Sequence, residues 1–311
     1  MAGPGVDQHA RRVSLSTMWA VARFAHMGDF VRAAKGMGFS DVELNHQVTP
    51  PLLAQLVSQY NRGEVTVSSV HDPCPSPPKG LAGSPQLSSL DESERCTAVD
   101  LAKRTLALAA DVGAKAVIIH AGRVEVDRRL ERRLRDLWPQ REGKADEYAE
   151  SLSRLRLERQ QRAAPHLDAA LRSLKEIEVT ARGLGLRIGL ENRYHYYEIP
   201  WVDEVAWLLD RLDSRVVGYW HDTGHAQVLA NQGFAPQEDW LIRYGARMVG
   251  VHLHDVDGLQ DHLATRGWDV DFAAIRPYIP EEAIRVCEFA PFNEPRQVGA
   301  GFIYLRDLGY F

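Results

Sequence analysis

Histidines and carboxylates recur in this chain directly after short runs of aliphatic residues. Val, Ile and Leu dominate each run, which is typical of a strand buried on both faces. Carboxylates and imidazoles are the side chains that bind divalent ions and move protons near neutral pH. The pattern therefore predicts a metal-binding or acid–base site assembled from strand ends. The groups concerned are His71 with Asp72, His120, Glu191 with Asn192, His221 with Asp222, His252 with His254 and Asp255, and Glu288.

The alternation of side chains along a strand separates the inward-facing residues from the others. Successive side chains point to opposite faces, so Trp220 and Asp222 share one face and His221 takes the other. By the same rule Gly250 and His252 face inward together, and His254 lies one layer above His252. We therefore expect His221 to be a buried histidine that is hydrogen-bonded to a neighbour outside the site.

Four inward-facing residues make the strongest candidate metal site. Glu191, Asp222, His252 and Glu288 supply three carboxylates and one imidazole. This mixed oxygen and nitrogen set suits Mn²⁺, Zn²⁺, Co²⁺, Fe²⁺ or Mg²⁺, and we favour Mn²⁺ or Zn²⁺. Without an ion, three buried carboxylates would repel one another and take up protons. The alternative interpretation is that one or two of them pair with Arg193 or Arg285.

His71 and His120 end the two strands before Glu191 and form a candidate second metal site, with Glu191 as the bridging ligand. The alternative role for these two histidines is hydrogen bonding to a substrate. The residue types allow both interpretations.

The elements that must position these groups alternate along the whole chain. Eight strand-like runs cover residues 13–19, 41–45, 67–71, 116–120, 187–191, 216–222, 248–255 and 283–289. Segments of helical period lie between them, among them 89–112, 162–184, 202–212 and 237–244. This order predicts a (β/α)8 TIM barrel, in which strand ends converge on one catalytic face. A doubly wound sheet would usually carry a glycine-rich turn after the first strand, and this chain has none there.

One region interrupts the rhythm. Residues 124–162 are dominated by Arg and Glu, with Trp138 and Pro139 among them. We expect a solvated helical pair inserted after the fourth strand of a single domain that spans residues 1–311. The alternative is a lid or a contact between subunits, because long βα insertions lie over the active-site face of such barrels.

Composition narrows the class of protein. The chain has 311 residues, 45% of them hydrophobic and 25% charged, which is ordinary for a globular protein. The longest apolar runs fall short of the roughly 18 residues that a membrane span needs. A net charge of −5 argues against a nucleic-acid partner. Three cysteines without a CxxC pair argue against a disulfide framework and favour a cytoplasmic location.

At these residues the sequence resembles the xylose-isomerase-like TIM-barrel superfamily. That superfamily holds sugar phosphate isomerases and epimerases together with the AP endonucleases of family 2. The resemblance is carried by Glu191-Asn192, Asp222-Thr-Gly-His225, His252-Leu-His254-Asp255, Asp261-His262 and Glu288.

The resemblance implies roles for these positions. In the sugar branch Glu191, Asp222, His252 and Glu288 are the metal ligands, Glu191 and Glu288 are also the acid–base pair, and His225 lies near the substrate. In the endonuclease branch the same set holds three zinc ions with His71, His120, His225 and an Asp-x-His pair. Here Gln260 replaces the aspartate of that pair, and His262 is the further candidate ligand. Related barrels also form homo-oligomers.

Together these features predict a divalent-metal-dependent isomerase or epimerase. It would act on a small sugar, keto-sugar or inositol-derived substrate by moving a proton at a carbon next to a carbonyl. We expect His225, His254, Asn192 and Trp19 to contact this carbohydrate-like substrate. Two alternatives use the same parts: a metal phosphodiesterase of the AP endonuclease type, and a lyase that dehydrates a keto-inositol.

Overall fold

The computed structural model describes residues 12–77 and 85–311, and it contains a closed barrel of eight parallel strands. Around the barrel the strands follow the order β1-β12-β9-β8-β6-β4-β3-β2. This arrangement confirms the predicted (β/α)8 fold. The barrel strands are β1 (Ser14–Ser16), β2 (Asp41–Leu44), β3 (Val67–His71), β4 (Ala116–Ile119), β6 (Arg187–Glu191), β8 (Val217–Asp222), β9 (Met248–Leu253) and β12 (Ile284–Cys287).

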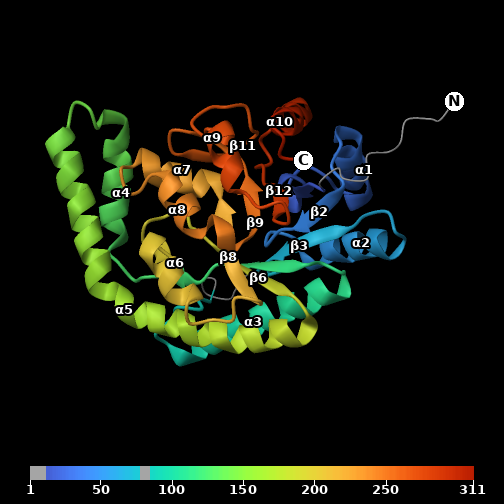
Figure 1. Ribbon diagram of the computed structural model, residues 1–311, viewed down its shortest axis with the longest axis horizontal. Coiled ribbons are helices and arrows are strands. Elements are labelled where there is room, and N and C mark those ends of the chain that lie inside the picture. The colour runs from blue at the N-terminus through green and yellow to red at the C-terminus, as the bar shows by residue number, and fades with distance from the viewer. Residues whose placement is uncertain (1–11, 78–84) are drawn as a thin grey trace.

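Helices surround the barrel, and Figure 1 shows them outside the ring of strands. The longer ones are α1 (Met27–Met37), α2 (Pro50–Asn61), α3 (Glu92–Asp111), α4 (Arg128–Leu137), α5 (Ala145–Leu184), α6 (Val202–Leu209), α7 (Thr223–Asn231), α8 (Gln237–Tyr244) and α10 (Pro295–Asp307), with the short α9 (Phe272–Ile275) before β12. Two small antiparallel pairs lie in the loops, β5 (Gly122–Arg123) with β7 (Glu198–Ile199) and β10 (Asp255–Asp257) with β11 (Gln260–Leu263). None of the described helices combines the length and apolar character needed to cross a bilayer.

The inner face of the barrel follows the expected parity. Trp220 fills the interior, and Gly189 and Gly250 make room for it on the two neighbouring strands. A Cβ atom at Gly250 would lie 2.3 Å from the Trp220 ring, and one at Gly189 would lie 2.6 Å from it. The ring centroid of His252 lies 5.1 Å from that of Trp220. Trp220 therefore forms the floor beneath the candidate site.

His221 points outward from the barrel, as predicted. It is fully buried, and its Nδ1 atom lies 2.7 Å from the hydroxyl of Tyr219. The first strand, in contrast, is shorter than expected. It ends at Ser16, and the rest of the predicted run forms the 3-10 turn Thr17–Trp19, whose first turn is capped by the Ser16 hydroxyl.

The charged insertion is helical, but its expected boundary at residue 162 is wrong. Helix α5 runs for 40 residues without a break, so its first half continues directly into the helix that covers the barrel. In Figure 1, α4 and the first half of α5 form an antiparallel pair at the side of the barrel, in green. The pair also buries more than its charged composition suggested, because Leu134, Leu155 and Arg159 are all buried.

Charge pairing explains how an arginine-rich segment can pack against the barrel. The guanidinium of Arg159 donates to both carboxylate oxygens of Glu204 on α6, at 2.6 and 2.7 Å. Its remaining N–H groups bond to the carbonyl oxygens of Tyr196 and Glu198. A buried charge can be accommodated in a protein interior when it is fully paired and hydrogen-bonded. The composition of the segment does not show this pairing, because the partners of Arg159 lie elsewhere in the chain.

Candidate active site

Four side chains converge where β6, β8, β9 and β12 end. Glu191, Asp222, His252 and Glu288 each offer one ligand atom, and these atoms all lie within 4.8 Å of one another. Each of the four residues is at most 2% exposed. The barrel register explains the convergence, because Glu191 is level with Trp220, and Asp222 and Val286 are both level with His252.

The His252 ring turns one nitrogen toward all three carboxylates. Its Nδ1 atom lies 2.6 Å from Glu191 Oε1, 3.3 Å from Glu288 Oε2 and 3.6 Å from Asp222 Oδ2. This donor set and spacing fit a divalent ion, with Nδ1 as the imidazole ligand atom.

Glu43 on β2, which the sequence analysis did not select, holds the other side of that ring. Its two oxygens lie 3.2 and 3.1 Å from His252 Nε2, and the Ser69 hydroxyl donates to one of them. Metal-binding histidines commonly donate their second ring N–H to a carboxylate, which fixes the tautomer and the ring orientation. Glu43 is therefore placed to present the Nδ1 lone pair of His252 to an ion.

Asn45 and His46, which follow β2, were missed as well. The Asn45 side chain donates to Glu288 Oε1 at 2.9 Å. The His46 ring centroid lies 4.9 Å from that of His71. The same rule that selected the later strand ends would have found Glu43, Asn45 and His46, because all three lie at or just after the end of a strand.

His71, His120 and Glu191 form a second group with ligand atoms within 4.8 Å of one another. The guanidinium of Arg193 contacts two members of this group. Arg193 Nη1 lies 2.6 Å from Glu191 Oε2 and also donates to His120 Nε2. The ion pair between a cluster carboxylate and Arg193, weighed above as an alternative, is thus present in addition to the four-residue convergence.

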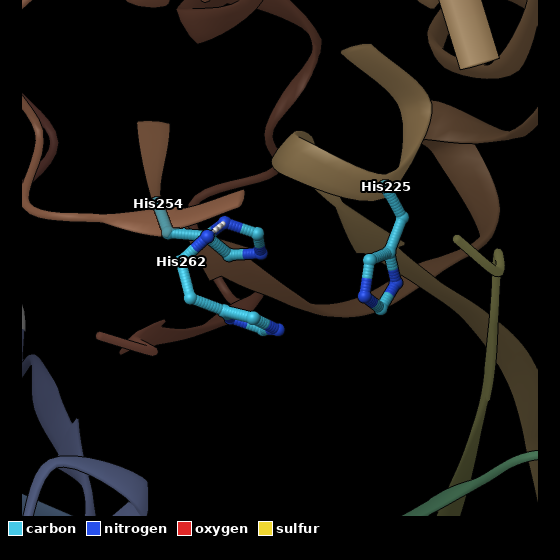
Figure 2. A group of neighbouring side chains, drawn as sticks. All are labelled: His225, His254 and His262. Atoms are coloured by element: carbon cyan, nitrogen blue, oxygen red, sulfur yellow. Dashed lines mark hydrogen bonds between the residues drawn. The ribbon is translucent and has the colours of Figure 1, made fainter. Parts of the chain in front are cut away.

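A third group consists of His225, His254 and His262 (Figure 2). The rings of His254 and His262 stack with centroids 4.1 Å apart, and His225 faces them from α7. The ring nitrogens of His254 are both engaged, since Nε2 lies 2.8 Å from Asp222 Oδ1 and Nδ1 accepts from the backbone N–H of His262. His254 therefore orients Asp222 as well as bordering the site.

His225 and His262 each use Nδ1 to donate to a backbone carbonyl, of Asn192 and Glu288 respectively. This arrangement turns the Nε2 atoms of both rings toward Asp261, whose Oδ2 lies 3.8 Å from the first and 3.6 Å from the second. Both rings are thereby placed to accept hydrogen bonds from a ligand at Nε2.

Asn192 and Trp19, which were predicted to contact the substrate, are both buried in this structure. Asn192 is fully buried, and its amide bonds to the backbone of Asp222 and to the Tyr219 hydroxyl. Trp19 is fully buried beside Phe24, and its indole N–H donates to the carbonyl of Asn293. Both residues thus support the loops around the site, and their contact with a substrate stays a prediction.

Two of the strand-end carboxylates, Asp255 and Asp72, accept hydrogen bonds from loop or helix residues outside the candidate metal site. Asp255 accepts backbone N–H bonds from Arg266, Gly267 and Trp268, which shapes the loop after β11. Asp72 accepts from the Thr105 hydroxyl on α3. Burial raises the pKa of Asp72 to about 6, although that hydrogen bond opposes the shift.

Burial and neighbouring charges move the pKa values of the two glutamates in opposite directions. Burial by itself raises the pKa of Glu191, but His120 and His252 outweigh it, and the pKa lies well below its usual range. Burial raises the pKa of Glu288, with His252 opposing and Glu43 adding to the shift. A pair of carboxylates whose pKa values are driven apart is typical of an acid–base pair.

A cavity of about 340 Å³ opens beside these groups, within the size range of small-molecule sites. The polar residues that line it include His46, Asp72, His120, Arg123, Arg193 and Glu198. It therefore adjoins Glu191 through His120 and Arg193.

Comparison with known proteins is consistent with this geometry. The family model described as a xylose isomerase-like TIM barrel matches residues 31–307. The chain belongs to that family. A search of curated proteins finds no match.

Among solved structures, a D-tagatose 3-epimerase-like protein has 18% identity and a TM-score of 0.66, with 96% of each chain covered. The 3-keto-D-glucoside 4-epimerase YcjR from E. coli has 14% identity and a TM-score of 0.65. The match covers 96% of the present chain and 100% of the YcjR chain. The TTHB071 protein from Thermus thermophilus, in a crystal soaked with ZnCl2, has 21% identity and a TM-score of 0.59, over 96% and 98% of the two chains. At these identities the likeness shows the shared fold.

Proposed function

We propose that this family member is a divalent-metal-dependent isomerase or epimerase that acts on a small sugar-like carbonyl compound. The observation that carries the proposal is the convergence of three buried carboxylates on the Nδ1 atom of His252. Three carboxylates in one buried place would be costly unless a cation offsets their charge. The sugar epimerases among the structures of similar fold support the choice of substrate class.

Glu191, Asp222, His252 and Glu288 would hold the ion. When bound, a divalent ion polarises a carbonyl and acidifies the C–H group next to it. Asp222 would be kept in place by His254 and by the backbone N–H of His225, which it caps. His252 would be oriented by Glu43.

The two glutamates would divide the proton transfer between them. Glu191, whose pKa is lowered, would take the proton from the substrate carbon as the general base. Glu288, the other carboxylate of the pair, would deliver a proton to the opposite face or to the adjacent carbon as the general acid. His225 and His262 would accept hydrogen bonds from substrate hydroxyls through Nε2, since their Nδ1 atoms are bound to the backbone.

Exchange of substrate hydrogen with solvent tests this mechanism. Ketoses, keto-inositols and hydroxypyruvate are incubated with the metal-loaded protein in D₂O and followed by proton NMR. We expect deuterium to appear at a carbon next to the carbonyl of one substrate class. Glu288→Gln keeps an oxygen ligand but removes the proton donor, so turnover should fall by roughly 10²–10⁴-fold. Glu64→Gln, an exposed glutamate paired with Arg62, is the control and should retain activity.

A metal phosphodiesterase is the second candidate, and the histidine group of Figure 2 together with His71 and His120 favours it. In that chemistry ions held by these histidines would activate a water for attack on phosphorus, and no substrate C–H bond would break. Absence of exchange across the whole panel, together with cleavage of abasic-site DNA that His71→Ala abolishes, would replace the first proposal by this one.

A further inference from the structure

Arg193 lies two residues beyond the end of β6, among the side chains of the His71, His120 and Glu191 group. The two closest polar atoms in that group are His120 Nε2 and Glu191 Oε2, which lie 2.7 Å apart. Arg193 Nη1 contacts both of them. A metal ion shared by His120 and Glu191 would need the lone pairs that this one nitrogen occupies.

The guanidinium is held from a second side and lies almost out of solvent. Arg193 Nη2 is 3.5 Å from Glu198 Oε1, and the side chain is only 11% exposed. A guanidinium carries N–H donors and no acceptor, and it stays charged throughout the pH range of a folded protein. Its Nη1 atom therefore lies against the Nε2 atom of His120, which is the atom that would otherwise bind a metal.

We propose that Arg193 is a built-in cation that takes the place of a second metal ion at His71, His120 and Glu191. The donor set of this group suits an ion, but the guanidinium already contacts two of its three members, His120 and Glu191, so a second ion does not fit while Arg193 is in place. The inference rests on the proposed function, in which the single ion lies among Glu191, Asp222, His252 and Glu288.

The substitution of a guanidinium for a metal ion would select between two chemistries. A second metal ion can lower the pKa of a bound water and supply hydroxide for hydrolysis, whereas a guanidinium cannot. A guanidinium can donate hydrogen bonds to an oxygen that becomes negative during proton transfer. Arg193 also lines the cavity beside Glu191, so it is placed to meet such an oxygen. The residue would thus favour isomerisation over phosphodiester cleavage.

Metal stoichiometry tests the proposal without any substrate. Each variant is dialysed against Zn²⁺ and its bound zinc is measured by elemental analysis. We expect His120→Ala to bind as many equivalents as the unaltered protein, because His120 holds no ion there. Arg193→Ala should bind one equivalent more, and the double variant with His120→Ala should lose it again. Arg123→Ala removes another arginine from the same cavity and should change nothing.

Two results would overturn the proposal. One is the loss of an equivalent in His120→Ala while Arg193 is intact, and the other is no gain in a folded Arg193→Ala. The first comparison retains Arg193 and therefore decides the matter even if Arg193→Ala does not fold. Failure of the proposed function would appear differently, as zinc content that is unchanged in the Asp222→Asn, His252→Ala double variant.

Discussion

Glu43 lies 3.1 Å from His252 Nε2, on the edge of the ring opposite the three carboxylates, although 209 residues separate the two positions. This contact leaves Nδ1 as the nitrogen that faces Glu191, Asp222 and Glu288. The imidazole therefore has one orientation available, and the carboxylate behind it raises its basicity as a ligand.

Removing Glu43 should weaken metal binding although Glu43 is not itself a ligand. We expect Glu43→Ala to reduce metal affinity by about 10–100-fold, the usual cost of losing a group that orients a ligating histidine. Glu43→Gln keeps an acceptor oxygen and should lose less. Calorimetric titration with Mn²⁺ or Zn²⁺ measures both effects.

Asp41→Asn provides the control for Glu43. Asp41 lies on the same strand at the other end of the barrel, where it pairs with Arg12. Its replacement should lower stability without changing metal affinity. Unchanged affinity in a folded Glu43→Ala protein would show that Glu43 does not act through His252.

Metal uptake should release protons and strengthen as the pH rises. Burial opposes a charge on His252, but Glu288 and Glu43 outweigh it and raise its pKa well above the ordinary value. Burial likewise raises the pKa of Glu288. Both groups then hold protons in the metal-free protein at a pH where free side chains would have lost them. An ion must displace these protons, so affinity should rise ~10-fold per pH unit for each proton released.

The number of protons released can be counted by titrating the metal in buffers with different ionisation enthalpies. His252→Gln, which cannot carry the proton, should release fewer. A metal affinity that is constant between pH 6 and pH 8 would contradict the expected coupling.

Loss of two ligands should abolish the ion altogether. Asp222→Asn combined with His252→Ala removes a carboxylate charge and the imidazole, and a partial set of ligands binds much more weakly than a complete one. Elemental analysis of the purified protein gives the result directly. His221→Gln is the matched control, because His221 is equally buried but points away from the site toward Tyr219. Metal retained at the usual level in the double variant would disprove the ligand assignment.

Gly224 should be intolerant of a side chain because of its distance to His254. A Cβ atom at Gly224 would lie 2.1 Å from Cε1 of the His254 ring, which is held in turn by Asp222. We expect Gly224→Ala to lower the free energy of unfolding by about 1–3 kcal/mol, as overpacking does, and to weaken metal binding. Gly36→Ala, in α1 with nothing within 4 Å of the added atom, should be neutral or stabilising by up to ~1 kcal/mol. Urea unfolding compares the two, and equal effects would argue against a specific contact with His254.

Replacing Glu204 should lower the free energy of unfolding more than replacing the adjacent Asp203. Glu204→Ala leaves the buried Arg159 guanidinium without its partner, at an expected cost of ~3–5 kcal/mol. Asp203→Ala breaks an exposed pair with Arg243 and should cost less than about 1 kcal/mol. A small effect at both positions would mean that α5 contributes little to holding the barrel together.

Much of this molecule follows from local sequence patterns. Runs of aliphatic residues gave the barrel strands, and the strict alternation of side chains placed Asp222 and His252 inward and His221 outward. These features depend on the geometry of a single strand, which adjacent residues determine. Ligand-type residues at successive strand ends then indicated one common site, because parallel strands of a barrel end on the same face.

The contacts between residues of the first and the last strands were decided only by the closure of the barrel. Glu43 meets His252, and Asn45 meets Glu288, because β1 pairs with both β2 and β12 and so brings the first strands beside the last. The direction of a side chain beyond a strand end is likewise set by its neighbours in space. Arg193 turned toward His120, and Asn192 turned toward the backbone of Asp222. Such contacts join residues far apart in the chain, so residue type and local spacing carry no record of them.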